Sequence, residues 1–487
     1  MIFKEDTRRK YLALAFLGVI FIISRILYYR AGIGFDTGTI TRNWQFIDIF
    51  LLKNDLWRSI FYMHTQPPLM NVLVGIVLQV FPDRYASILQ AFFLLSGVVL
   101  IISIYLLGNK FGFPRYLSFV LAAWFSVSPA TILYENRLIY AYPTLVLLVV
   151  SAVFYARIIE NKRVVDIIIF SFALAIMALT WAIFHLVWLF GCFGILFYML
   201  RKEIRKALWL TPAFILVFAW YAKNEALYGS FTASSWAGLN LFKTVTIQIP
   251  GKVRKQWVDE GMVSKLALVP PYRSPEVYLK YFPETPITGI PLLDEYEEAS
   301  GYRNQHHLSY IYAGERYFKD ALRMIMIAPR YYLGTLPHSV YIFFHSASDY
   351  KHLSGRGAID KLDTFWNRMF YGQWQKDESS NELIHSFSLY HTGWWLAAQF
   401  VMAFMGAPIY LWQHRAHIHS LNPALVLFMF WNILFITTAG IMLDIGENNR
   451  TRFGIDPLIL LLSVFLVRRI FLQINEKRNA LANDNVP

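Results

Sequence analysis

The chain has 487 residues, of which 56% are hydrophobic, 17% aromatic and only 16% charged. A soluble protein cannot bury this much apolar surface, and the apolar residues form runs long enough to cross a bilayer, which takes about 20 residues. The formal charge of +13 does not indicate a nucleic-acid partner, because Lys and Arg cluster between the apolar runs as topological signals. The single cysteine, Cys192, excludes an intramolecular disulfide and a cysteine metal site. Composition therefore predicts an all-α polytopic membrane protein.

The N-terminal region predicts one membrane span followed by an outer loop, residues 30–68. Tyr11–Tyr29 is the first span, and the basic residues before it indicate a cytoplasmic N-terminus and an uncleaved anchor. From Thr41 to Met63 apolar residues recur at helical spacing with charges between them, which is typical of an interfacial helix. The loop closes on His64, Gln66, Pro67 and Pro68.

Asp36, in the sequence GFDTG at the start of this loop, has two interpretations. An acid at the mouth of a membrane, covered by an interfacial helix, suits chemistry on a lipid-linked substrate. Aspartate is also a common capping residue, and Asp36 then only caps a helix that begins near Thr37.

The rest of the N-terminal membrane module, residues 1–222, is predicted from span length and charge. Leu69–Phe81 is apolar but only about 13 residues long, so we expect it to be interfacial or re-entrant. Basic connections alternate correctly only if this segment does not cross. Six further spans are predicted: Tyr85–Leu107, Tyr116–Leu133, Tyr142–Ile159, Val164–Trp181, Phe184–Leu200 and Ala207–Tyr221.

After Tyr221 the chain becomes polar and rich in proline, which indicates an external (periplasmic) loop domain over residues 223–386. In it Leu308–Ile327 has the pattern of an amphipathic helix, whereas the membrane depth of Tyr331–Phe344 stays open. Residues 387–470 are predicted to hold three spans: Trp394–Trp412, Pro423–Met442 and Ile455–Val467. Residues 471–487 are predicted to form a cytoplasmic tail, disordered from Asn475. The expected architecture is about ten transmembrane helices in the plasma (inner) membrane, with both termini cytoplasmic.

With this topology, ionisable residues gather on the outer side of the membrane. Glu135 and Arg137 lie at the outer end of one span, and a second group precedes the last span: Asp444, Glu447, Arg450 and Arg452. Charged residues beside spans are costly unless solvated or paired, so this gathering indicates a site. The alternative is ordinary ion pairing, of Glu135 with Arg137 and of the two late arginines with the nearby carboxylates.

The order of these features resembles the start of GT-C-type integral-membrane glycosyltransferases, in the branch of protein O-mannosyltransferases and bacterial aminoarabinose or galacturonic acid transferases. The features are a first span, an outer loop opening with Asp36, an interfacial helix, and then HTQPPLMNVLVGI and FPDRYASILQ. The family's Pro-Pro-Leu run and following Arg match Pro67-Pro68-Leu69 and Arg84. Its second acidic motif corresponds to Glu135, and its late patch looks like Arg450-Thr451-Arg452-Phe453. The resemblance covers about the first 160 residues and is weak through the external domain.

The chain departs from the family in two places. The family often has two acids in the first loop, whereas Asp36 is followed by Thr37, which weakens a metal-binding interpretation of the loop. Many members have a basic residue just before Pro-Pro, where this chain has Gln66 with His64 two residues earlier. The donor phosphate is then left to His64 or to the pair Arg450 and Arg452.

The resemblance implies a glycosyltransferase that faces the periplasm and uses a polyprenyl-phosphate sugar as donor. The acceptor would be an envelope glycan, lipid or protein. Asp36 would be the general base for an inverting transfer, with Glu135 in a supporting catalytic role. The residues expected to bind substrate are His64, Gln66, Arg84, Arg137, Arg450 and Arg452. No cofactor is implied with certainty, although a divalent metal is possible.

Two other classes of protein fit part of the sequence. A transporter or lipid flippase is the main alternative, but transporters tend to carry internal repeats and ionisable groups near the bilayer midplane, and the chain has no internal repeat. A non-enzymatic scaffold in envelope assembly is the third, because the external domain could serve as a docking surface. The sequence leaves the sugar and the acceptor open.

Overall fold

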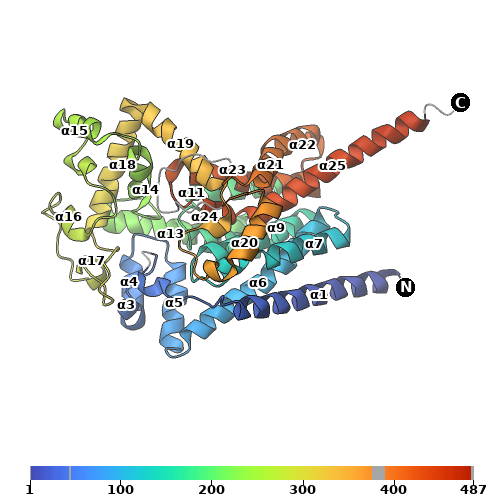
Figure 1. Cartoon of the computed structure of the whole chain (residues 1–487), viewed down its shortest axis with the longest axis horizontal. Helices are drawn as coiled ribbons and strands as arrows, with labels where there is room; N and C mark the ends of the chain where they lie inside the picture. The colour runs from blue at the N-terminus through green and yellow to red at the C-terminus, as the bar shows by residue number, and fades with distance from the viewer. Residues whose placement is uncertain (1, 43–44, 376–389, 484–487) are drawn as a thin grey trace.

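The computed structural model describes residues 2–42, 45–375 and 390–483. Regular structure in this part of the chain is helical, and its β pairing is limited to the isolated bridges Asp36–Arg137 and Glu297–Arg303. Long helices form a bundle in which the first helix begins and the last helix ends at the same end of the molecule, while the shorter helices of the middle of the chain lie at the opposite end (Figure 1). The all-α prediction is confirmed.

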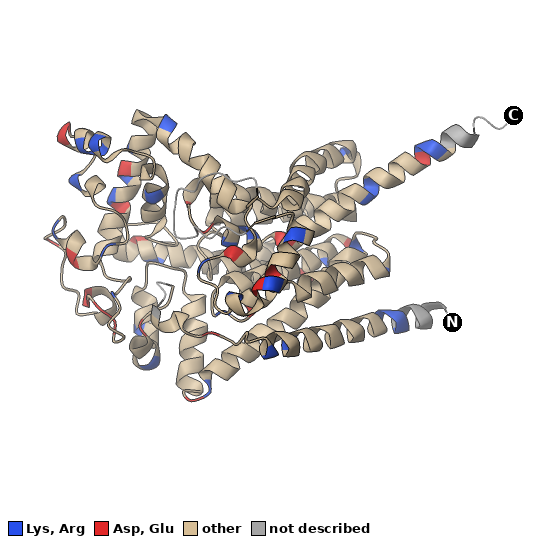
Figure 2. Ribbon diagram, in the orientation of Figure 1, with Lys and Arg blue, Asp and Glu red and all other residues tan. Residues whose placement is uncertain are grey.

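Seven helical segments of the described chain are long and apolar enough to cross a membrane, or up to eight if a bent pair counts as one span. They carry few charged residues along their length, and Lys, Arg, Asp and Glu concentrate at their ends and in the shorter helices (Figure 2). The chain is therefore a polytopic membrane protein. The segments are Arg8–Arg30 in α1 (Ile2–Arg30), α6 (Tyr85–Lys110), α9 (Ala141–Asn161), Arg201–Tyr228 ending in α13 (Thr211–Tyr228), Trp394–Gln413 from α21 (Trp394–Val401) to α22 (Ala407–Gln413), α23 (Leu421–Leu443) and Asp456–Asn479 in α25 (Asp456–Asn483).

Three of the predicted spans look different in the structure. The span expected over Tyr116–Leu133 is two helices, α7 (Arg115–Val127) and α8 (Pro129–Glu135), bent by 58°. The break follows from the sequence, because Pro129 has no N–H to continue the helix and Ser128 caps α8 by accepting from the Thr131 amide at 3.3 Å. Two more are short helices of 15 and 14 residues, α10 (Val164–Ala178) and α11 (Leu186–Met199).

The first loop does not form the single interfacial helix that its periodicity predicts. It folds as three short helices, α2 (Thr39–Arg42), α3 (Ile49–Asn54) and α4 (Leu56–Tyr62). Asp48 caps α3 by accepting from the Phe50 amide at 2.9 Å, and Asp55 leaves the helical region at φ −141°, so each aspartate separates two segments. The next helix, α5 (Leu69–Val80), has 12 residues and is too short to cross by itself, in line with its apolar length.

The region after α13 has its own hydrophobic core, built from residues between Trp236 and Leu336. Its centre is the crossing of α14 (Ala237–Thr246) and α18 (Ser309–Ile327). A Cβ at Gly238 would come within 1.9 Å of the Gly314 carbonyl oxygen, so the glycines allow this close approach. The amphipathic helix predicted over Leu308–Ile327 is α18. Further helices are α15 (Gly251–Asp259), α16 (Pro275–Leu279), α17 (Pro291–Asp294) and α19 (Pro329–Phe343).

The last part of the chain brings two short elements to one end of the bundle. They are α20 (Asp360–Trp366), which continues into the π-helical turn η6 (Asn367–Tyr371), and α24 (Asn448–Phe453). The tail expected to be disordered from Asn475 is instead helical to Asn483 as part of α25. The predicted domain boundary at residues 386 and 387, and residues 484–487, lie outside the described residues.

Candidate active site

Asp36 is held by two segments that are distant in the sequence. Its amide donates to the Asn136 carbonyl at 2.8 Å, and the Leu138 amide donates to the Asp36 carbonyl at 3.1 Å, which forms a short parallel bridge. Its Oδ2 accepts from Arg137 Nη1 and from Ser354 Oγ, and Arg137 Nη1 also donates to Ser354 Oγ at 2.7 Å. The Asp36 and Arg137 side chains remain 30% and 17% exposed. The carboxylate is therefore held at a surface that a substrate can reach.

The other oxygen of Asp36 closes a local turn and does not bond an amide of α2. Oδ1 accepts from the Gly38 amide at 2.7 Å, one residue before α2 begins. Burial would raise the pKa of Asp36, but the bonds from Ser354, Gly38 and Arg137 outweigh it and lower the pKa below its usual range. Asp36 is thus an ionised carboxylate at neutral pH, and the local turn at Gly38 accounts for only part of its contacts.

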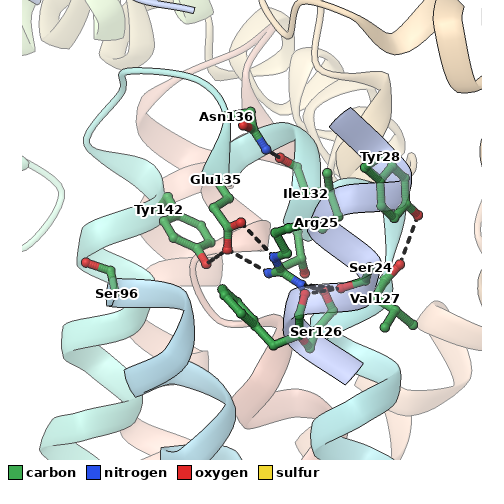
Figure 3. A network of polar contacts seen from close by, with 12 residues as sticks. Ser24, Arg25, Tyr28, Ser96, Ser126, Val127, Ile132, Glu135, Asn136 and Tyr142 are labelled. Carbon is green, nitrogen blue, oxygen red and sulfur yellow. Dashed lines mark hydrogen bonds and ion pairs between the residues drawn. The ribbon is translucent and has the colours of Figure 1, made fainter. Parts of the chain in front are cut away.

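Glu135 does not pair with Arg137, the alternative that the sequence left open, but with Arg25. It ends α8, is 1% exposed, and accepts from Arg25 of α1, with Nε on Oε1 at 2.8 Å and Nη2 on Oε2 at 2.6 Å. Tyr142 OH donates to Oε2 at 2.7 Å (Figure 3). Arg25 also donates to the Ser126 carbonyl at 2.9 Å, which ties α1 to the end of α7. The bidentate pair is a buried contact between helices rather than a surface ion pair.

Arg450 lies in a box of aromatic rings with a single ionic partner. Its guanidinium carbon is 5.2 Å from the ring centre of Tyr140 and 5.4 Å from those of Trp181 and Tyr350, within cation–π range. Its Nη2 lies 2.5 Å from Glu447 Oε2, whereas Nε and Nη1 are buried without a hydrogen-bond partner. The predicted pairing with Glu447 is therefore present and leaves one edge of the guanidinium unused.

Neighbouring charges keep both Arg450 and Glu447 ionised. Burial would lower the pKa of Arg450, but the Glu447 carboxylate and neighbouring tyrosines raise it well above its usual range. Burial would raise the pKa of Glu447, and Arg450 and Lys243 outweigh that and lower it. Asp444, the other predicted partner, pairs with Lys243 instead at 2.6 Å. Arg450 is thus a permanent cation at the site.

Arg452 points away from Arg450, although the sequence places them two residues apart. Both lie on α24, where residues i and i+2 face different sides of the helix. Arg452 is 0% exposed, its Nε is 3.8 Å from Asp456 Oδ1, and its three guanidinium nitrogens have no hydrogen-bond partner. The structure brings Arg450, and not Arg452, into the aromatic box.

The remaining predicted residues lie elsewhere, and no contact of the described residues joins them to Asp36 or Arg450. His64 is buried between two protein partners, with Nδ1 2.8 Å from Ser235 Oγ and Nε2 2.9 Å from the His306 carbonyl. Burial and the neighbouring His306 lower the pKa of His64 well below its usual range, so it is neutral. Gln66 is 8% exposed, and Arg84 lies in the exposed turn before α6.

One loop of the predicted external domain, residues 345–356, supplies groups that sequence reasoning missed. Besides Ser354, it places Tyr350 OH as a donor to Glu447 Oε1 at 3.4 Å and His352 Nε2 at 3.9 Å from the same oxygen. Burial lowers the pKa of His352, partly opposed by Glu447 and reinforced by Arg450 and Arg137. This loop therefore connects the Asp36–Arg137 pair with the Arg450 box. A local signal existed only in its polar composition, HSASDYKHLSGR.

Within the described residues no group of three or more His, Cys, Asp and Glu side chains is placed to hold a metal ion.

Comparison with known proteins gives a likeness to several solved structures. No protein-family model matches the chain, and no curated protein matches it. Seven chains of solved structures match. One is the oligosaccharyltransferase of Archaeoglobus fulgidus in the apo form, with 12% identity and a TM-score of 0.41, over 97% of this chain and 52% of that chain.

Two further structures are of an oligosaccharyltransferase from the same archaeon. One, in complex with an inhibitory peptide and a dolichol-phosphate, has 11% identity and a TM-score of 0.38, over 98% of this chain and 52% of that chain. The other, tethered to an acceptor peptide containing the NVT sequon by a disulfide bond, has 10% identity and a TM-score of 0.39, over 95% and 50%. The chain spans about half the length of these proteins, and a likeness of this size carries no argument about its substrate or activity.

Proposed function

We propose that the protein is a GT-C-type integral-membrane glycosyltransferase that moves a sugar from a polyprenyl-phosphate donor to an envelope acceptor, with inversion at the anomeric carbon. The observation that carries the proposal is that one loop, residues 345–356, contacts both an accessible carboxylate, Asp36, and a caged arginine, Arg450, whose Nε and Nη1 have no hydrogen-bond partner. Such a planar edge suits two oxygens of a phosphate, which it binds through charge-assisted bonds.

The reaction needs a base and a stabilised leaving group. An acceptor hydroxyl attacks the anomeric carbon, the bond from that carbon to the phosphate oxygen breaks, and the lipid phosphate leaves with the electron pair. The hydroxyl proton passes to Asp36. Arg450 stabilises the charge that grows on the leaving phosphate, and Glu447 keeps its guanidinium oriented. No acid is required for the leaving group, because a phosphate diester is already anionic.

The resting contacts of Asp36 make it a weak base until the donor binds. Arg137 and Ser354 both donate to the oxygen Oδ2, which lowers the pKa of the carboxyl. We propose that the donor phosphate draws Arg137 away from Asp36, because a phosphate oxygen competes for the same donor. Loss of that partner raises the basicity of Asp36 when the acceptor is in place.

Glu135 takes a positioning role in this scheme instead of the catalytic one that the family resemblance implies. It is buried and fully engaged by Arg25 and Tyr142. The residue after it, Asn136, accepts from the Asp36 amide, and the next, Arg137, pairs with the Asp36 side chain. The Arg25–Glu135 pair thus sets α1 against α8 and, with them, the two segments that meet at Asp36.

The direct test is the chemistry of the envelope in a strain that lacks the protein. Mass spectrometry of its glycans, lipids and surface proteins should show one component lighter by a single sugar, restored by the wild-type gene. An unchanged set of masses contradicts the proposal. The flippase alternative predicts a different result, namely loss of every product downstream of one lipid-linked precursor and accumulation of that precursor on the cytoplasmic leaflet.

A further inference from the structure

The segment formed by α20 and η6 has its polarity reversed relative to a helix of a water-soluble domain. Leu362, Phe365 and Met369 are 43%, 57% and 58% exposed, while Asp363 and Asn367 on the other face are 0% and 3% exposed. The spacings 362, 365, 369 and 363, 367 place the two groups on opposite faces of one helix. In a helix beside water, the apolar face is the one that turns inward.

The buried polar residues are fixed by hydrogen bonds, so the segment cannot simply turn over. Asp363 Oδ2 accepts from Arg356 Nε at 3.1 Å, and Asn367 Nδ2 donates to Asp363 Oδ1 at 3.3 Å. Asn367 also donates to Ser348 Oγ at 3.2 Å and accepts from Ser346 Oγ at 2.9 Å. Turning the helix would break this network and bury unpaired polar groups, which costs more than the network itself contributes.

The segment also packs on a candidate membrane span near the end that carries Asp36. Trp366 stacks on Trp124 of α7 with ring centres 5.8 Å apart, and Phe370 meets the same ring at 5.5 Å. Trp124 lies in the last turn of α7, and α20 also packs on α8. The exposed apolar face is therefore continuous with the side of a bundle whose helices are suited to a bilayer.

We infer that the apolar face of α20 and η6, formed by Leu362, Phe365, Met369 and Phe370, lies in the bilayer together with Trp374 just after η6 and is covered by lipid acyl chains. A membrane satisfies both faces, because lipid surrounds the apolar side chains while the polar face stays in the protein. Lys361 lies at the exposed edge and reaches the headgroups by extending its side chain, whereas the exposed Arg368 donates from Nε to the Trp374 carbonyl at 3.1 Å. The segment is an interfacial helix within a region whose sequence indicates an external domain.

The embedded helix adds a lipid-facing wall to the candidate site, a consequence that rests on the proposed function. Arg356, which holds Asp363, lies two residues after Ser354, and Ser354 donates to Asp36. The isoprenoid tail of a lipid-linked donor bound at Arg450 would leave the site along this apolar face. The same helix therefore couples insertion in the leaflet to the position of the loop that holds the base.

The embedding is tested with the full-length protein in phospholipid vesicles. Single cysteines are placed at positions 362, 365 and 369 in a Cys192→Ala background, because Cys192 is buried and is the only native thiol. Each cysteine carries a nitroxide, and power saturation compares collisions with oxygen, which enters hydrocarbon, and with a nickel chelate, which stays in water. The matched control is Ile287, an apolar residue that is 92% exposed in the external region.

Oxygen collisions should exceed nickel collisions several-fold at 362, 365 and 369, and the reverse should hold at 287. Nickel contact at 365 equal to that at 287 overturns the inference, because the face is then in water. Protection from both reagents also overturns it and indicates that protein, such as a second copy of this chain, covers the face.

A second measurement separates this inference from the proposed function. Phe365→Asp should raise the KM for a long-chain lipid-linked donor several-fold, with a smaller effect on a donor with a short, water-soluble tail. An equal effect on both donors refutes the proposed path of the tail. Hydrocarbon contact at the three labelled positions in a protein that transfers no sugar would leave the embedding standing and refute the proposed function alone.

Discussion

Replacing Arg450 with lysine separates phosphate recognition from ordinary ion pairing. Lysine keeps the positive charge for Glu447, which lies 2.5 Å from the native guanidinium, so a purely structural pair should tolerate the change. Lysine cannot offer the planar edge made by Nε and Nη1, the two nitrogens that have no protein partner. The substitution thus removes the feature that suits a phosphate and keeps the one that suits a carboxylate.

The expected magnitude follows from the bond that is lost. A hydrogen bond to a charged group contributes roughly 1.5–3 kcal/mol, which corresponds to roughly a 10- to 150-fold loss in kcat/KM for the donor. Arg452→Lys is the matched control on the same helix, and we expect its donor kinetics to match the wild type, because Arg452 faces Asp456 and not the aromatic box. Initial rates over a range of donor concentrations, with purified protein in vesicles, give both values.

Protein stability must be followed in parallel. Heating the detergent-extracted protein and measuring the monodisperse fraction should give similar midpoints for the wild type and Arg450→Lys, because the Glu447 pair persists. Wild-type donor kinetics in Arg450→Lys would refute the phosphate role of this residue. A loss of equal size in Arg452→Lys would show that α24 as a whole, rather than the unused edge of Arg450, controls activity.

The remaining predictions test the surroundings of the site. The acid limb of the kcat/KM profile should lie below the ordinary aspartate pKa of 3.8, because the folded pKa of Asp36 is lowered, and Ser354→Ala should move that limb to higher pH. The acid limb of the kcat profile reports the donor-bound enzyme and should lie at higher pH than the kcat/KM limb. Coincident limbs would contradict the release of Arg137. By the same shift, the contribution of Asp36 to stability is complete above its unfolded pKa and is lost as pH falls through the folded pKa, so thermal midpoints should fall in acid, and earlier in Ser354→Ala. Glu135→Gln should destabilise the protein by about 3–5 kcal/mol, because it leaves Arg25 buried and unpaired. The double variant Arg25→Met with Glu135→Gln should recover stability and activity. A stable but inactive double variant would make Glu135 catalytic. Impermeant thiol reagents applied to intact cells should label single cysteines on the Asp36 side of the membrane, at Thr37, Ser300 and Lys351. Single cysteines on the opposite side, at Asn161 and His417, should stay unlabelled. The reverse pattern would invert the topology.

The membrane helices could be predicted because hydropathy depends on local sequence. The prediction failed where a helix cap or a proline interrupts a segment whose apolar residues recur at helical spacing. The pattern from Thr41 to Met63 fits one helix, yet capping by Asp48 and the turn at Asp55 divide it. Pro129 breaks the span expected over Tyr116–Leu133 in the same way, and here the sequence carries a visible signal.

The candidate site was predicted in part, because its members come from distant segments. Asp36, Arg137 and Arg450 were found from charge next to membrane spans. Ser354, 318 residues away from Asp36, left no such signal, since a contact at that separation depends on the whole fold. Proximity in sequence was misleading for Glu135, which pairs with Arg25 across 110 residues and not with its neighbour Arg137.

The central claim, that Asp36 does chemistry, is tested most directly by comparing two identical substitutions in the same loop. Asp48 is the control, because it caps α3 and also accepts from the Ala299 amide at 2.7 Å. Asparagine caps a helix about as well as aspartate, so both variants should fold. With purified protein and lipid-linked donor, Asp36→Asn should abolish transfer while Asp48→Asn keeps it. Wild-type turnover in Asp36→Asn would contradict the account and leave Asp36 with a structural role alone.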